Sequence, residues 1–132
     1  MKNRHAVLVM FLVICLFPAG EILAARVAPP AVPVKDTVTM VDLGAKSCIP
    51  CKMMAPILEE LKETYKGRLE IVFIDVWENP DEARKYNIKL IPTQIFYDTE
   101  DKELFRHEGF FAKEDILSKW KELGITLDAE GQ

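Results

Sequence analysis

The sequence predicts one α/β domain with a mixed sheet of about four strands and helices on both faces. Three observations support this fold class. The 132 residues are enough for one domain. Strand-type apolar runs alternate with segments of helical periodicity. The last two strand-type runs are separated by a short polar turn instead of a helix. The expected order is β-α-β-α-β-β-α.

The first pair of elements is a buried strand followed by a long helix. Residues 38–43 (VTMVDL) are apolar and β-branched apart from one acid, Asp42, which is typical of a buried strand. Asp42 could instead be a solvated acid on an edge strand, but its apolar neighbours favour burial. Residues 49–66 carry apolar side chains at helical spacing, and Gly67 is a suitable stop. The expected buried positions are Met54, Ile57, Leu58, Leu61 and Tyr65.

The second pair is a strand over residues 69–76 (LEIVFIDV) and a short helix that opens at Asn79-Pro80. Asn79 can cap this helix, Pro80 suits its first position, and Glu82 would complete a capping box. Because helices join the first three strands, parallel neighbours are expected.

The C-terminal part is a hairpin and a last helix. Residues 94–97 and 103–108 are strand-like and flank the turn DTEDK, so they should pair antiparallel. Residues 113–123 form a helix that ends at Gly124, and its buried positions should be Ile116, Leu117, Trp120 and Leu123.

The N-terminal 25 residues have the layout of a secretory signal peptide. Lys2 and Arg4 precede an apolar run over residues 6–17, and the small residues Ala24 and Ala25 follow. The run is shorter than the roughly 20 apolar residues that span a bilayer, so an uncleaved anchor is the less favoured alternative. We expect cleavage near residue 25 and a periplasmic or otherwise exported product.

Export would divide the chain into a removed segment (1–25), a proline-rich extended segment (26–36) and a folded domain (37–132). Cys15 would leave with the signal, and a lipoprotein signal fits poorly because Ile14 stands where a small residue is wanted. Only Cys48 and Cys51 would then be left, in a compartment where disulfides persist. The net charge of −4 gives no indication of nucleic-acid binding.

Cys48-Ile49-Pro50-Cys51 allows three interpretations. A zinc site wants about four ligands, but the mature chain would add only His107, so only a site shared between chains stays open. A purely structural disulfide is poorly placed here, because the pair closes a very short loop and would constrain the unfolded chain little. A redox pair fits best. Cys48 lies where a helix begins, and the free N–H groups and the dipole there favour a thiolate. Cys51 lies one turn further in.

Four motifs then resemble the thioredoxin family, from about residue 38 to 123. They are Val41-Asp42, six residues before the first cysteine; Cys48-Ile49-Pro50-Cys51-Lys52 with Met53-Met54-Ala55-Pro56; Ile91-Pro92-Thr93; and Gly109. The resemblance implies a thioredoxin fold.

The resemblance also assigns roles to the matching positions. Cys48 would be the nucleophile, Cys51 the resolving thiol, and Asp42 the buried acid/base that serves Cys51. Pro92 would be a cis proline facing the disulfide, and Ile91 would offer backbone hydrogen bonds to substrate. The other substrate-binding positions would be Ile49, Pro50 and Gly109.

The chain departs from the family pattern in several places. Ser47 and Gly44 stand where tryptophans are frequent, and Phe73 stands where a lysine often neighbours the buried acid. Without that cation, desolvation should raise the pKa of Asp42. The family's opening strand and helix are also missing. Met53 and Met54 are expected to pack in the helix, and His107 to be exposed. The sequence does not decide whether Trp77 meets solvent or substrate.

The expected function is an exported thiol–disulfide oxidoreductase, with Ile91 before Pro92 favouring a reductase. The expected partners are proteins with disulfides or thiols and a membrane-borne electron donor, but no nucleic acid. A monomer without metal, flavin or nucleotide is expected. The alternatives are an apocytochrome c thiol reductase and a redox-inactive peptide-binding module.

Overall fold

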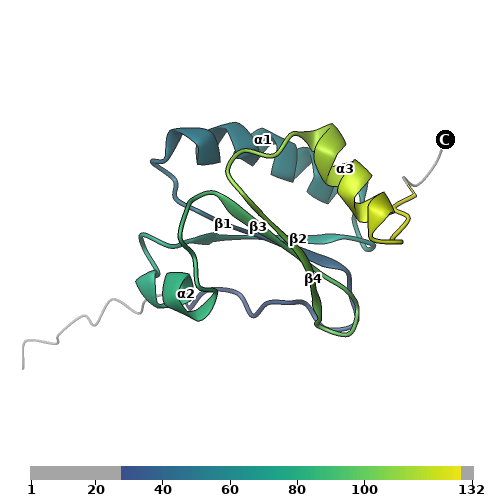
Figure 1. The fold of residues 1–132 in the computed structure, drawn as a ribbon, viewed down its shortest axis with the longest axis horizontal. Coiled ribbons are helices and arrows are strands. Elements are labelled where there is room, and N and C mark those ends of the chain that lie inside the picture. The colour runs from purple at the N-terminus through teal and green to yellow at the C-terminus, as the bar shows by residue number, and fades with distance from the viewer. Residues whose placement is uncertain (1–27, 129–132) are drawn as a thin grey trace, which may run out of the picture.

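A computed structural model describes residues 28–128, and the predicted signal segment with Cys15 lies outside them. The elements follow the predicted order (Figure 1). Their bounds are β1 (Thr39–Gly44), α1 (Ile49–Thr64), β2 (Glu70–Asp75), α2 (Pro80–Lys85), β3 (Thr93–Tyr97), β4 (Glu103–Glu108) and α3 (Lys113–Glu122).

The strands form one mixed sheet in the order β2-β1-β3-β4. β1 pairs with β2 in parallel, whereas β1–β3 and β3–β4 are antiparallel. The expectation that all helix-joined strands run parallel is therefore wrong for β3. The six residues of α2 rise only about 9 Å, which is too short to return the chain along the roughly 20 Å of β2. The chain instead crosses to the other side of β1, where β3 runs antiparallel to β1.

Helices cover both faces of the sheet, as predicted. Figure 1 shows α1 and α3 on one face and α2 on the other. Side chains alternate along β1, so Met40 packs under α1 and α3 with Phe96 and Trp120. Val41 and Leu43 face the opposite way. Leu117, Leu123 and Ile57 are only half-buried.

The predicted capping box at α2 does not form. The Asn79 side chain makes no cap hydrogen bond; its Nδ2 donates to the Asp75 carbonyl at 3.0 Å, and Glu82 pairs with Lys85. The asparagine is thus used to close the turn after β2.

The proline-rich segment lies against the second face of the sheet. Val32 packs on the cluster that contains Val41 and Tyr86, and the Tyr86 hydroxyl donates to the Val32 carbonyl at 3.4 Å. The Val32–Pro33 bond is cis, which the sequence did not indicate.

Four side chains complete the comparison with the sequence. Met54 is fully buried, but Met53 is exposed, so the packing role predicted for Met53 is wrong. His107 is half-buried and stacks on Phe111 with ring centroids 4.0 Å apart, whereas exposure was expected. Trp77 is exposed.

Candidate active site

Cys48 and Cys51 form a disulfide at the start of α1, with Cα atoms 5.3 Å apart. Cys48 is the N-cap residue, in an extended conformation (φ −79°, ψ 128°), and Pro50 occupies the first turn. The backbone N–H of Cys51 donates to the Cys48 Sγ at 3.3 Å. Because Cys48 lies outside the helix, the two sulfurs can meet, and the same position offers helix N–H groups to a Cys48 thiolate.

Both cysteines are largely covered while the disulfide is closed. Cys48 is 8% exposed and Cys51 is 4% exposed, so the two residues differ little in exposure in this state. Ala45 and the half-buried Ile91 pack against them.

Asp42 lies on the central strand β1 and is 0% exposed, so the alternative of a solvated edge acid is wrong. It shares the α1 face with Gly44, where an added Cβ would lie 3.2 Å from the Cys51 Sγ. Asp42 is two residues further back, about 7 Å along the strand, so its side chain lies on the same face of the sheet as Cys51. Burial raises the pKa of Asp42 to about 6, although a hydrogen bond from Gln94 acts in the opposite direction.

Gln94 is the site residue that sequence reasoning missed. It is fully buried on β3 in register with Asp42, and its Nε2 donates to Asp42 Oδ1 at 2.8 Å. A signal was available, because an amide two residues before the core residue Phe96 lies on the buried side of a strand.

The remaining predicted residues gather at the same end of the sheet. The Ile91–Pro92 bond is cis, and Thr93 Oγ1 donates to the Leu90 carbonyl at 2.6 Å just beside it. Gly109 has φ 101°, a conformation that favours glycine, and its N–H donates to the Pro92 carbonyl at 2.7 Å. Ile49 is 74% exposed next to the disulfide.

This geometry has close counterparts among known proteins. The family model "Thioredoxin" matches residues 30–122. The chain belongs to the thioredoxin family. It is 42% identical to a thioredoxin of Staphylococcus aureus over 83 residues, which are 63% of this chain and 79% of that protein.

Solved thioredoxins agree in fold. Chloroplastic thioredoxin z superposes with a TM-score of 0.61 at 34% identity, covering 67% of this chain and 80% of that one. Thioredoxin-2 of a malaria parasite gives 0.63 at 28% identity, covering 70% and 88%. With its disulfide at the helix N-terminus, this thioredoxin-family chain is a thiol–disulfide oxidoreductase.

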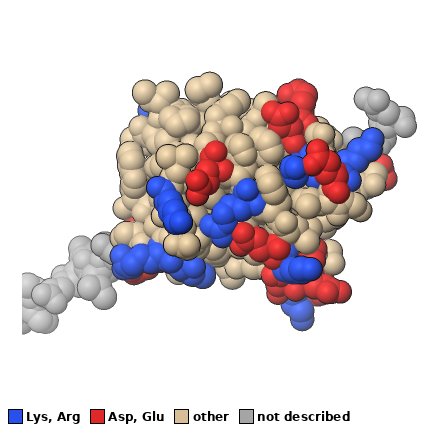
Figure 2. Space-filling view, in the orientation of Figure 1, with Lys and Arg blue, Asp and Glu red and all other residues tan. Residues whose placement is uncertain are grey.

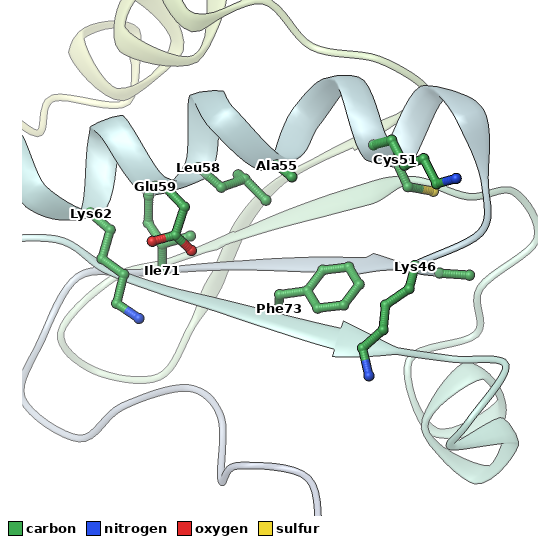
Figure 3. A pocket seen from close by; sticks show the side chains of 10 residues that line it. Lys46, Cys51, Ala55, Leu58, Glu59, Lys62, Ile71 and Phe73 are labelled. Atoms are coloured by element: carbon green, nitrogen blue, oxygen red, sulfur yellow. The ribbon is translucent and has the colours of Figure 1, made fainter.

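A cavity of about 290 Å³ lies between α1 and β2, and Phe73, one of the departures from the family pattern, lines it. Gly44 lets Cys51 and Phe73 approach the strand, since an added Cβ would lie 3.1 Å from Phe73 Cε2. Figure 3 shows Phe73 between Lys46 and Lys62, with Cys51 at one end.

In residues 28–128 no group of three possible ligands could hold a metal, and no helix is long and apolar enough to cross a bilayer.

Asp75 connects, through hydrogen bonds, the loop after β1 and the loop after β2, which both border the active site. Its carboxylate accepts the N–H groups of Lys46 and Trp77, both at 2.9 Å, and of Glu78 at 3.1 Å. Burial pushes the pKa of Asp75 upward, but these hydrogen bonds and the Lys46 charge outweigh burial and hold it below its usual value. The loop that leads to Cys48 is therefore fastened to the end of β2.

Asp75→Ala should lower the free energy of unfolding at neutral pH by about 1–3 kcal/mol, because three backbone donors lose their acceptor. The depressed pKa means that this stabilisation is present above the unfolded-state pKa and is lost as pH falls through the folded-state value. Denaturant melts at pH 7 and at acid pH should show a difference from wild type that shrinks on acidification. Glu100→Ala, in the exposed β3–β4 turn, is the control, and an equal loss there would contradict a special role for Asp75.

Proposed function

We propose that this protein is an exported reductase of protein disulfides. The observation that carries the proposal is Cys48 at the N-cap of α1, with its Sγ accepting the Cys51 N–H. That hydrogen bond and the helix dipole stabilise the thiolate, which is the attacking form of the thiol.

The reaction proceeds through a mixed disulfide. The Cys48 thiolate attacks one sulfur of a substrate disulfide, and the other substrate sulfur leaves as a thiolate that takes up a proton. Asp42 accepts the Cys51 proton, and the resulting thiolate attacks the Cys48 sulfur. The second substrate sulfur leaves, and the Cys48–Cys51 disulfide is restored. Two electrons pass from protein to substrate, and a membrane-borne donor of two electrons returns them.

Exposed apolar side chains support a protein as the substrate. Strand directions place the ends of β1, β2 and β4 and the start of β3 at the disulfide end of the sheet. Five exposed large apolar residues belong to the segments there: Ile49, Met53, Trp77, Leu90 and Phe110. Figure 2 shows few charged side chains where α1 begins. Such a patch is typical of an interaction surface.

Trp77→Ser combined with Phe110→Ser should raise the KM for insulin about tenfold and leave kcat nearly unchanged, because the patch binds substrate but does not react. Reduction of a small disulfide such as 5,5′-dithiobis(2-nitrobenzoate) is the control and should not change. A loss of kcat on both substrates would point to disruption of the redox pair instead.

Insulin reduction with dithiothreitol as the electron source tests the reductase. No catalysis by wild type would favour a redox-inactive peptide-binding module. The Cys48–Cys51 reduction potential, measured against glutathione and dithiothreitol series, tests the direction of electron flow. Faster reduction of an oxidised Cys-x-x-Cys-His peptide than of insulin would favour an apocytochrome c thiol reductase.

Export is tested on the native product. Lys2, Arg4 and the apolar run over residues 6–17 support it. Mass spectrometry should find an N-terminus near Arg26 in the exported fraction. A product that begins at Met1 would contradict cleavage.

A further inference from the structure

A row of four side chains crosses the sheet beneath α1. Strand register places Phe73 of β2 beside Asp42 of β1, Gln94 of β3 beside Asp42, and His107 of β4 beside Gln94. Asp42 thus has an aromatic ring on one side and an amide on the other. Phe73 stands where the family often has a lysine, so no cation adjoins Asp42 in this row. The neighbouring polar group that can hydrogen-bond to the carboxyl is the amide of Gln94.

The two buried groups are joined by one hydrogen bond and each keeps one free oxygen. Gln94 Nε2 donates to Asp42 Oδ1 at 2.8 Å. Among the described residues, Asp42 Oδ2 and Gln94 Oε1 have no hydrogen-bond partner. Both side chains are fully buried, so solvent does not compete for these atoms at the surface. Unpartnered buried oxygens are uncommon in proteins and call for an explanation.

We propose that Gln94 is a positioning residue, which holds the Asp42 carboxyl by Oδ1 and leaves Oδ2 as the oxygen that exchanges a proton with Cys51. The catalytic part of this inference, proton transfer from Cys51, rests on the proposed reductase function. The proton leaves the Cys51 sulfur as Cys51 attacks the mixed disulfide, and it joins Asp42 Oδ2. It returns to solvent before the next turnover, so protons and electrons balance with the reductase cycle.

An amide suits this role better than a cation. A lysine would stabilise mainly the carboxylate, whereas the glutamine amide can donate to Oδ1 in the ionised acid and also when Oδ2 carries the proton, because Oδ1 is then a carbonyl oxygen. Gln94 can therefore hold the carboxyl through both halves of the cycle. Other ionisable groups stand further out: Lys46, Lys52, Glu59 and Lys62 line the cavity by α1, Lys46 is paired with Glu78, and His107 is one strand beyond Gln94.

The first measurement is the titration of Asp42, monitored by carboxyl ¹³C NMR in the oxidised protein, where neither Cys48 nor Cys51 titrates. Gln94→Leu removes the donor to the ionised form, so the Asp42 midpoint should rise by about one pH unit or more. Gln94→Met tests the same loss with a side chain of nearly the same shape. Tyr97→Phe, on the opposite face of β3, is the control and should leave the midpoint unchanged.

The second measurement is the rate at which Cys51 resolves a preformed mixed disulfide on Cys48. A midpoint raised by one unit from about 6 nearly halves the ionised fraction of Asp42 at pH 7, so Gln94→Leu should resolve about twofold more slowly at pH 7 and about tenfold more slowly at pH 5, with its pH profile moved upward by the same interval. In an Asp42→Asn background, Gln94→Leu should have no further effect on the profile. This double variant separates action through Asp42 from a merely structural loss.

An unchanged Asp42 midpoint in both folded Gln94 variants would overturn the proposal, as would an equal profile shift in the Asp42→Asn background. The failure of wild type to reduce insulin would instead contradict the proposed function, while the titration would still decide whether Gln94 controls Asp42.

Discussion

Replacing Cys48 by serine is expected to reduce the rate of insulin reduction to that of dithiothreitol alone, a loss of about 10³-fold or more. The serine hydroxyl can occupy the N-cap of α1 and accept the Cys51 N–H, so the helix should start as in wild type. What is lost is the sulfur that forms the mixed disulfide. Cys51 lies in the first turn of the helix and not at its N-cap, so its sulfur is not the one stabilised as a thiolate and does not take over the attack.

The matched variant is Cys51→Ser, which keeps the attacking sulfur and removes the resolving one. It should accumulate mixed disulfides on Cys48 that are visible by non-reducing electrophoresis, because no second thiol releases them. Residual turnover of Cys48→Ser above the dithiothreitol background would contradict the assignment, and so would faster iodoacetamide labelling of Cys51 than of Cys48 in the reduced protein.

Much of the fold could be predicted from local patterns, because each element carries its own signal. The apolar spacing of α1 and the hairpin around the DTEDK turn depend on residues close in sequence, and both appear within two residues of the expected bounds. The direction of β3 could not be obtained this way. It depends on how far the short helix α2 carries the chain, which is a property of the packed molecule.

The same distinction applies to the site. Cys48 and Cys51 lie in one short motif at the start of a helix, and the cis bond before Pro92 is what the family resemblance implies, so both were accessible from the sequence. Gln94 became part of the site only through its register with Asp42, 52 positions away. Asp75 likewise acts on the loop that contains Lys46, 29 positions away. Spacing along the chain cannot reveal such pairs.

Asp42→Asn is expected to make the fold more stable at neutral pH and the enzyme about 10²-fold slower, the low end for a lost acid/base group. Burial raises the folded-state pKa of Asp42 from 3.8 to about 6. A rise of roughly two pH units is worth about 3 kcal/mol of destabilisation once the acid is ionised in both states. Asparagine has nearly the same size and can keep a hydrogen bond to Gln94, but it carries no charge.

The pH window follows from the direction of that shift. Between the two pKa values the folded state binds more protons than the unfolded state, so the stability from Asp42 falls as pH rises from about 4 to above 6. Denaturant melts should therefore show Asp42→Asn gaining about 1–3 kcal/mol over wild type at pH 8 and little at pH 4. Asp36→Asn, on the exposed segment before β1, is the control and should show no such gain. Insulin reduction at pH 7 completes the comparison, because an Asp42→Asn protein that is more stable at pH 8 yet as active as wild type would leave the carboxyl buried but without a part in proton transfer.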